Sequence, residues 1–216
     1  MTEHNFEHMR RAMVASQLRT TGVNDPRVVA AMGEVPRERF VPPERCALAY
    51  ADALVPLGHG RDLNSPMALG RMLSEAHLGG GERALVIGAA TGYSAAVLAR
   101  LVRSVVAVEE VPELVDFARA ALPGTRLELV QAPLTEGYPA GAPYDFVLID
   151  GAVEHVPQAI VDQLADGGEF ALALIDEGVT RLCVGRVAGG AFGTTAFSDA
   201  AAAVLPGFLK PRGFSF

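Results

Sequence analysis

Two glycines and a carboxylate are the residues whose types and spacing first suggest chemistry. Gly88 and Gly92 follow the apolar run 83–87, and Glu109 ends a second apolar run, 105–108. Glycines let the main chain turn sharply and approach a ligand closely, and a helix that begins there favours polar or anionic groups. An acid roughly 20 residues after such a turn is well placed to accept hydrogen bonds from ribose hydroxyls. This segment therefore predicts a nucleotide or nucleoside pocket, although a glycine turn alone also occurs in tight packing of a strand on a helix.

Alternating strand and helix patterns position these residues. The strand 83–87, the helix 93–102 and the strand 105–108 form a β-α-β unit. Further strand and helix patterns follow at 112–121, 126–130, 144–150, 157–164 and 169–174. Such alternation predicts an α/β fold with a doubly wound, mostly parallel sheet, whose ligands bind beyond the carboxyl ends of the strands. The runs 181–187 and 191–197 predict antiparallel strands at the C-terminal edge.

The N-terminal part predicts a helical cap on this sheet. Residues 6–20 have helical periodicity, and Asp25 and Pro26 are typical of a helix start. The stretch 51–66 is rich in Gly, Pro, Asp and Asn and predicts a long irregular loop, of the kind that often carries function. We therefore expect one domain over 1–216, made of a cap and active-site loop (1–80), a Rossmann-like core (81–175) and C-terminal strands with a tail (176–216).

Composition excludes several classes of protein. The 216 residues are 50% hydrophobic and 20% charged, which is typical of a folded globular protein. The net charge of −7 argues against a nucleic-acid partner, because such proteins carry a concentrated basic face. The sequence has no signal-peptide core and no apolar run long enough to span a membrane, so we expect a cytoplasmic protein. Cys46 and Cys183 lie far apart and predict neither a disulfide nor a metal site. The oligomeric state stays open.

Three ligand chemistries compete for the predicted pocket. A dinucleotide oxidoreductase would need Gly-x-Gly-x-x-Gly, and a phosphate-binding loop would end in Gly-Lys-Ser/Thr; the sequence at 88–92, GAATG, has neither. An S-adenosylmethionine methyltransferase matches best. Its glycine turn, its acid at Glu109, the loop 131–133 and the polar strand end at Asp150 would all meet in one crevice.

The sequence also resembles the protein-L-isoaspartate O-methyltransferases over about residues 10–175. The words that carry the resemblance are Gln-Leu-Arg at 17–19, Val-Pro-Arg-Glu at 35–38, Phe-Val-Pro at 40–42, Ala-Tyr-Ala-Asp at 49–52, Pro-Leu-Gly-x-Gly at 56–60, Gly-Tyr-Ser-Ala-Ala-Val-Leu-Ala at 92–99 and Leu-Ala-Asp-Gly-Gly at 164–168. The resemblance implies a Rossmann-like methyltransferase fold. It also implies S-adenosylmethionine as methyl donor, S-adenosylhomocysteine as product, and isoaspartyl residues of damaged peptides or proteins as acceptor.

The resemblance assigns roles to residues of this chain. Cofactor contacts are implied at Gly88, Ala90, Gly92, Glu109, Ala132 and Pro133, and catalytic roles at Asn64 and Ser65. Asp150, where the family has a small or neutral residue, is expected to compensate for a lost cofactor contact, and His59 and Gly60 in the loop are expected to contact the substrate. Each role has a structural alternative. Glu109 can be a solvated strand-end acid, Asn64 and Ser65 can form a turn before a proline, and Asp150 can cap the next segment.

Several of these positions depart from the family pattern. Ala90 replaces the middle glycine of the turn, Val86 replaces an acid, Ala132-Pro133 replaces an Asp-Gly pair, and Asn64 replaces the active-site serine. Two other functions therefore stay open. One is a divergent relative with a degraded cofactor pocket that acts as a non-catalytic binding or regulatory protein. The other is a methyltransferase with a different acceptor.

Overall fold

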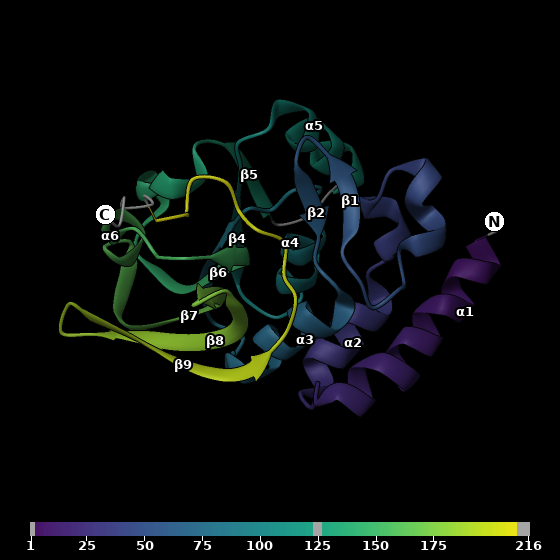
Figure 1. Cartoon of the computed structure of the whole chain (residues 1–216), viewed down its shortest axis with the longest axis horizontal. Coiled ribbons are helices and arrows are strands. Elements are labelled where there is room, and N and C mark those ends of the chain that lie inside the picture. The colour runs from purple at the N-terminus through teal and green to yellow at the C-terminus, as the bar shows by residue number, and fades with distance from the viewer. Residues whose placement is uncertain (1–2, 123–126, 211–216) are drawn as a thin grey trace.

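A seven-stranded sheet forms the centre of the molecule (Figure 1). The computed structural model describes residues 3–122 and 127–210. The sheet order is β5-β4-β3-β6-β7-β8-β9. Its strands are β3 (Arg83–Ile87), β4 (Ser104–Glu109), β5 (Leu127–Gln131), β6 (Tyr144–Val153), β7 (Leu164–Asp176), β8 (Val179–Ala188) and β9 (Ala191–Asp199). Strands β3 to β7 are parallel, and β8 and β9 join antiparallel at one edge. The predicted α/β fold is confirmed.

The register of the central strands sets the position of the site. Ile87 of β3 pairs with Val108 of β4 on one side and with Ile149 of β6 on the other. These strands are apolar along nearly their whole length because both faces of the sheet are covered. The next residue of each strand therefore lies at one shared edge: Gly88, Glu109 and Asp150.

The helices at 93–98 and 158–161 are shorter than the predicted 93–102 and 157–164, whereas the helix at 112–121 has the predicted bounds. They are α1 (Glu3–Met13), α2 (Pro26–Glu34), α3 (Pro66–Glu75), α4 (Tyr93–Leu98), α5 (Pro112–Ala121) and α6 (Gln158–Val161), with a π-helical turn at Val14–Leu18 and 3-10 turns at Arg19–Thr21, Arg37–Phe40, Pro43–Leu48, Leu134–Glu136 and Pro139–Gly141. Asp25 caps α2, since its side chain accepts a hydrogen bond from the amide of Arg27 at 2.8 Å.

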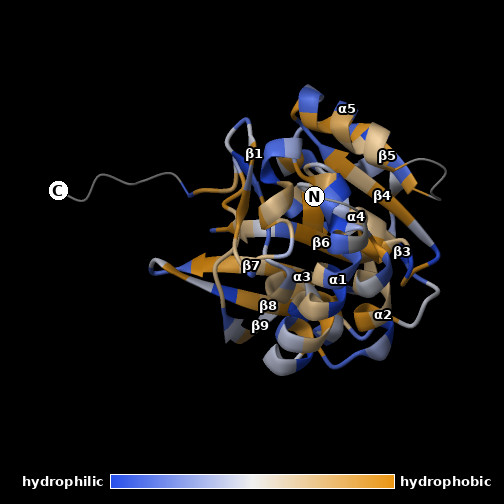
Figure 2. Cartoon of the chain, turned by 90° about the vertical axis from the view of Figure 1, so that its right-hand side faces the viewer, coloured by the Kyte–Doolittle hydropathy of each residue, from blue (hydrophilic) through white to orange (hydrophobic). Residues whose placement is uncertain are grey.

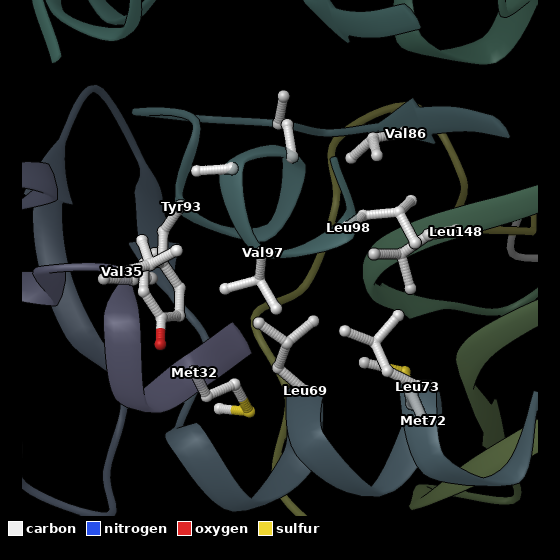
Figure 3. Packing of buried hydrophobic residues seen from close by; sticks show 14 of the residues in the cluster. Met32, Val35, Leu69, Met72, Leu73, Val86, Tyr93, Val97, Leu98 and Leu148 are labelled. Carbon is white, nitrogen blue, oxygen red and sulfur yellow. The ribbon is translucent and has the colours of Figure 1, made fainter. Parts of the chain in front are cut away.

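Helices α2, α3 and α4 pack together on one face of the sheet. Figure 3 shows Leu69 of α3 directed toward Val97 of α4, with Met32 of α2 beside Leu69 and with Val86 and Leu148 contributed by the sheet. All five side chains are buried. Seen from the side, the strands are the most apolar layer of the molecule (Figure 2). The opposite face of the sheet packs against α6 and the C-terminal tail.

The irregular loop predicted over 51–66 is wrong. Strands β1 (Val55–Gly58) and β2 (Arg61–Leu63) pair as an antiparallel hairpin there. Buried and exposed side chains alternate along β1, but four residues containing a proline and a glycine give too short a pattern to recognise. His59 and Gly60 form the turn with positive φ angles of 54° and 70°, and Gly58 precedes them at 87°.

We expect Leu69→Ala to destabilise the fold strongly. Leu69 is 1% exposed within the α2–α3–α4 packing, so truncation removes buried apolar surface and leaves a cavity. The free energy of unfolding should fall by about 2–5 kcal/mol. Leu48→Ala is the control, because that side chain is 43% exposed and its loss should change stability by less than about 0.5 kcal/mol. Denaturant unfolding followed by circular dichroism measures both; equal effects would contradict the packing described here.

Candidate functional site

Glu109 is the organising residue of the site. Its side chain is fully buried at the carboxyl end of β4. Oε2 accepts a hydrogen bond from the amide of Ala90 at 2.8 Å, and Oε1 accepts from the amides of Glu110 at 3.0 Å and Val111 at 3.2 Å. The carboxylate thereby fixes the glycine turn after β3 to the end of β4. The alternative of a solvated strand-end acid does not hold.

The guanidinium of Arg61 closes over this carboxylate. Nη1 of Arg61 donates to both carboxylate oxygens of Glu109, at 2.6 and 2.8 Å, and Nη2 donates to the carbonyl oxygen of Gly88 at 3.1 Å. The two side chains are 2% and 0% exposed. Desolvating two charges is offset only when the pair is close and richly hydrogen bonded, as it is here. Sequence reasoning missed Arg61; its one signal was a cation inside a segment that was predicted to carry function.

Asn64 joins three segments of the chain. Its Nδ2 donates to Oδ1 of Asp150 at 2.7 Å and to the carbonyl oxygen of Asp150 at 3.1 Å. Its Oδ1 accepts from the amide of Ala203 at 2.7 Å. The end of the hairpin, the end of the central strand β6 and the C-terminal tail are therefore held by one buried amide.

Asp150 is a buried carboxyl at the end of the central strands. Burial raises the pKa of the Asp150 carboxyl above its ordinary value, and the hydrogen bonds from Ser94 and Asn64 and the charges of Arg61 and Arg37 only partly oppose that rise. Arg37 is itself fully buried; its Nε donates to the carbonyl oxygen of Ala49 at 2.6 Å, and its Nη2 donates to that of Asn64. A guanidinium keeps its proton in such surroundings, so Arg37 is a second buried cation beneath the site.

Ser65 caps α3. Its Oγ accepts a hydrogen bond from the amide of Ala68 at 3.2 Å, and Pro66 occupies the first turn of the helix. The side chain is 6% exposed. The hydroxyl thus satisfies one of the free amides that begin a helix.

The C-terminal tail covers the glycine turn. Its Ala203 accepts from the amide of Ala152 at 2.6 Å, and the amide of Leu205 donates back to Ala152 at 3.0 Å. A Cβ atom added to Gly88 would lie 2.9 Å from Leu205 Cδ2 and 3.1 Å from Arg61 Nη2. Figure 1 shows this tail, in yellow, crossing from the end of β9 over the middle of the sheet.

The remaining turn residues have different surroundings. Ala90 is held at a φ of 48°, a left-handed conformation that glycine adopts more readily. Gly92, at a φ of 94°, is where α5 comes close, since an added Cβ would lie 2.7 Å from Leu122 Cδ1 and 3.3 Å from Ala118 Cβ. Gly92 therefore permits packing of α5, whereas Gly88 faces the crevice.

The loop after β5 and the hairpin tip border the site. The amide of Ala132 donates to the carbonyl oxygen of Glu109 at 3.2 Å, and Pro133 precedes a 3-10 turn. His59 and Gly60 are exposed at the tip of the hairpin, where His59 Nδ1 lies 3.9 Å from Glu113 Oε2 on α5. Direct hydrogen bonds join Glu109 to Ala90 and Ala132, and Arg61 bridges Glu109 to Gly88. Asn64 and Asp150 form a separate hydrogen-bonded pair, and His59 and Gly60 are exposed at the hairpin tip.

Neither a metal cluster nor a membrane-spanning helix occurs in the described residues. Across 3–122 and 127–210, no three His, Cys, Asp or Glu side chains are grouped to hold a metal ion. In the same ranges, no helix is both long enough and apolar enough to cross a bilayer.

In this arrangement other groups of the chain cover two residues that an adenosyl cofactor would contact, Glu109 and Gly88. The carboxylate that would meet a ribose already accepts hydrogen bonds from one guanidinium and three amides. The face of Gly88 that would approach the ligand is covered by Leu205 and Arg61. Arg61 and Leu205 thus occupy the space next to Glu109 and Gly88.

Comparison with known proteins identifies close relatives in sequence. A model of the family "Protein-L-isoaspartate(D-aspartate) O-methyltransferase (PCMT)" matches residues 9–183. Protein-L-isoaspartate O-methyltransferase 1 of Rhodopseudomonas palustris is 40% identical over 182 residues, which cover 82% of this chain and 74% of that protein. Protein-L-isoaspartate O-methyltransferase 2 of Marinobacter nauticus is 38% identical over 200 residues, covering 90% and 91%.

Two solved structures share the fold. One protein-L-isoaspartate O-methyltransferase superposes with a TM-score of 0.79 at 23% identity, covering 92% of this chain and 66% of the other. A second, from Plasmodium falciparum and solved in complex with S-adenosyl-L-homocysteine, has a TM-score of 0.75 at 17% identity, covering 92% and 97%. At these identities the likeness establishes the Rossmann-like methyltransferase fold.

We expect Ser65→Ala to destabilise the protein through loss of the α3 cap. The free energy of unfolding should fall by about 1 kcal/mol, within a range of about 0.5–2 kcal/mol. Ser65→Thr is the matched control, because threonine keeps the accepting hydroxyl. Urea unfolding of the three proteins measures the difference, and equal stability of Ser65→Ala and the unsubstituted protein would show that the hydroxyl does not cap the helix.

We expect Asp150→Asn to stabilise the protein at neutral pH. Because the pKa of Asp150 is raised by folding, the folded state binds more protons between the unfolded and folded pKa values, and stability is lost as pH rises through that window. Asparagine carries no charge and still offers an oxygen to Asn64. The gain should shrink as pH falls toward the ordinary Asp pKa of about 4.

Urea unfolding between pH 4 and 8 tests this expectation. Asp116→Asn on α5, where the carboxylate is 75% exposed, controls for the loss of one acidic group. A gain for Asp150→Asn that stays constant across this range would contradict a folding-induced rise in the pKa of Asp150.

Proposed function

We propose that this chain, which belongs to the protein-L-isoaspartate(D-aspartate) O-methyltransferase family, transfers a methyl group from S-adenosylmethionine to the free carboxyl of isoaspartyl residues in peptides and proteins. The observation that carries the proposal is the family match over residues 9–183. That range contains both the β-α-β unit with its glycine turn and the hairpin that faces it. S-adenosylhomocysteine would be the second product.

This chemistry asks little of acids and bases. A carboxylate is already a nucleophile, and a sulfonium supplies an activated methyl group, so neither a general base nor a covalent intermediate is needed. The protein would contribute proximity and orientation, which in favourable cases account for about 7–11 kcal/mol of a reaction barrier.

The roles of individual residues follow from their positions. Gly88, Ala90 and Glu109 are proposed to bind the cofactor, since they meet at the carboxyl edge of β3 and β4. Ala132 and Pro133 border the same edge beyond β5. Gly92 supports the turn through its contact with α5.

The acceptor side of the crevice is proposed to lie along the hairpin. Asn64 presents an amide that can donate to a carboxylate, as a serine hydroxyl would, and it now donates to Asp150. Ser65 is proposed to act by starting α3, which fixes the position of its neighbour Asn64. His59 and Gly60, exposed at the hairpin tip, are positioned to touch a peptide.

Methyl transfer to paired synthetic peptides tests the proposal. The two peptides are identical except that one carries an L-isoaspartyl residue where the other carries a normal aspartyl residue. With methyl-labelled S-adenosylmethionine, we expect a base-labile methyl ester on the isoaspartyl peptide alone. Equal labelling of both peptides would overturn the acceptor, and the absence of label from both would overturn the proposed function.

A further inference from the structure

We propose that Arg61 and the C-terminal tail form an internal plug of the cofactor pocket, which must withdraw before S-adenosylmethionine binds. The plug consists of the Arg61 guanidinium on Glu109 and the Leu205 side chain on Gly88, with Asn64 holding the tail. The inference rests on the proposed function, because it concerns the same pocket. It adds a closed state of the enzyme and names the residues that close it.

Arg61 is the hydrogen-bond partner of Glu109 that a ligand can displace. A carboxylate offers about four lone-pair positions, and this one accepts from three amides in addition to the guanidinium. The amides belong to the turn and to the chain after β4, so they stay when a ligand binds. Within the described residues, Arg61 is the only side chain that donates to Glu109 and the only donor that a ribose could displace.

The C-terminal tail covers the main chain at Gly88 and near the end of β6. Leu205 is fully buried, and it packs where the main chain at Gly88 would otherwise be open to a ligand. It also packs on the end of β6, since an added Cβ at Gly151 would lie 2.5 Å from Leu205 Cγ and 2.6 Å from the carbonyl oxygen of Ala203. The tail thus covers the carboxyl ends of both β3 and β6, where ligands of such sheets bind.

Asn64 couples the two parts of the plug. It lies three residues after Arg61, just beyond β2, and accepts from the amide of Ala203 two residues before Leu205. A movement of the hairpin that frees Glu109 therefore also removes a hydrogen bond from the tail. Gly58 and Gly60 lie on either side of His59 at positive φ angles of 87° and 70°, and nothing lies within 4 Å of an added Cβ at either, so no packed side chain there opposes a movement of the hairpin tip.

The closed state leaves one buried hydrogen-bond donor of Arg61 unsatisfied among the described residues. Nε of Arg61 is buried without a hydrogen-bond partner among the described residues. A buried donor without a partner disfavours the arrangement that holds it. Withdrawal of Arg61 into water would satisfy that donor, which partly offsets the loss of the ion pair and lets a ligand compete for Glu109.

Calorimetric titration with S-adenosylhomocysteine tests the plug without turnover. A closed pocket lowers the apparent affinity by the fraction of open molecules, so weakening the plug should strengthen binding. We expect Arg61→Gln to bind at least tenfold more tightly than the unsubstituted protein and Leu205→Ala at least threefold more tightly. Arg181→Gln on β8, 37% exposed and distant from Glu109 in the sheet order, should bind as the unsubstituted protein does.

The outcomes separate the plug from the proposed function. Equal or weaker binding by folded Arg61→Gln and Leu205→Ala, beside measurable binding by the unsubstituted protein, would overturn the plug alone. No binding by any of the four folded proteins would overturn the cofactor and the plug together. Circular dichroism establishes folding, and Leu205→Ala serves if Arg61→Gln, which leaves Glu109 without its counter-charge, does not fold.

A fluorescent probe in the tail gives an independent readout. The chain contains no tryptophan, so Leu209→Trp, at a position 52% exposed and four residues after Leu205, would be its one indole. We expect its emission to change on titration with S-adenosylhomocysteine, with the midpoint found by calorimetry. Unchanged emission at a saturating ligand concentration would overturn withdrawal of the tail.

Discussion

The buried ion pair between Arg61 and Glu109 is the contact on which the arrangement of the site depends. It ties the hairpin β1–β2 to the carboxyl edge of the sheet, and the same carboxylate orders the turn after β3. Removing one partner would leave the other as an uncompensated charge in a site that water does not reach. The hairpin, the turn and the strand end are therefore one electrostatic unit.

The structure explains two residues that differ from the family pattern, Ala90 and Val86. Ala90 keeps a left-handed conformation because its amide is held by Glu109, so the geometry of the turn survives without the glycine. Val86 is buried in the packing around Leu98 and Leu148 (Figure 3). A carboxylate at position 86 would be desolvated among apolar side chains here, so the valine suits its surroundings.

The sheet could be predicted from sequence, because buried parallel strands are continuous apolar runs. The location of the crevice could be predicted as well, because each of these runs ends at a glycine or a polar residue. Asp25 could be predicted as a cap because an aspartate directly before a proline is a local pattern typical of a helix start. The contacts that close the site were not predictable. Arg61 and Glu109 lie 48 residues apart, and Asn64 and Ala203 lie 139 apart, so no local pattern relates them. The hairpin was missed because its strands span only four and three residues.

A closed pocket is compatible with the methyltransferase activity of the family, because cofactor binding and opening of the pocket are thermodynamically linked. A cofactor and the Arg61 guanidinium compete for Glu109, so each weakens the binding of the other by the same factor. A ribose offers neutral hydroxyls to Glu109, whereas Arg61 offers a charge. The binding free energy lost with the charged contact must be recovered from contacts that only the open crevice exposes, at Gly88 and along the end of β6. An excess of cofactor can therefore populate the open state, and the tail then behaves as a displaced competitor whose release is coupled to cofactor concentration.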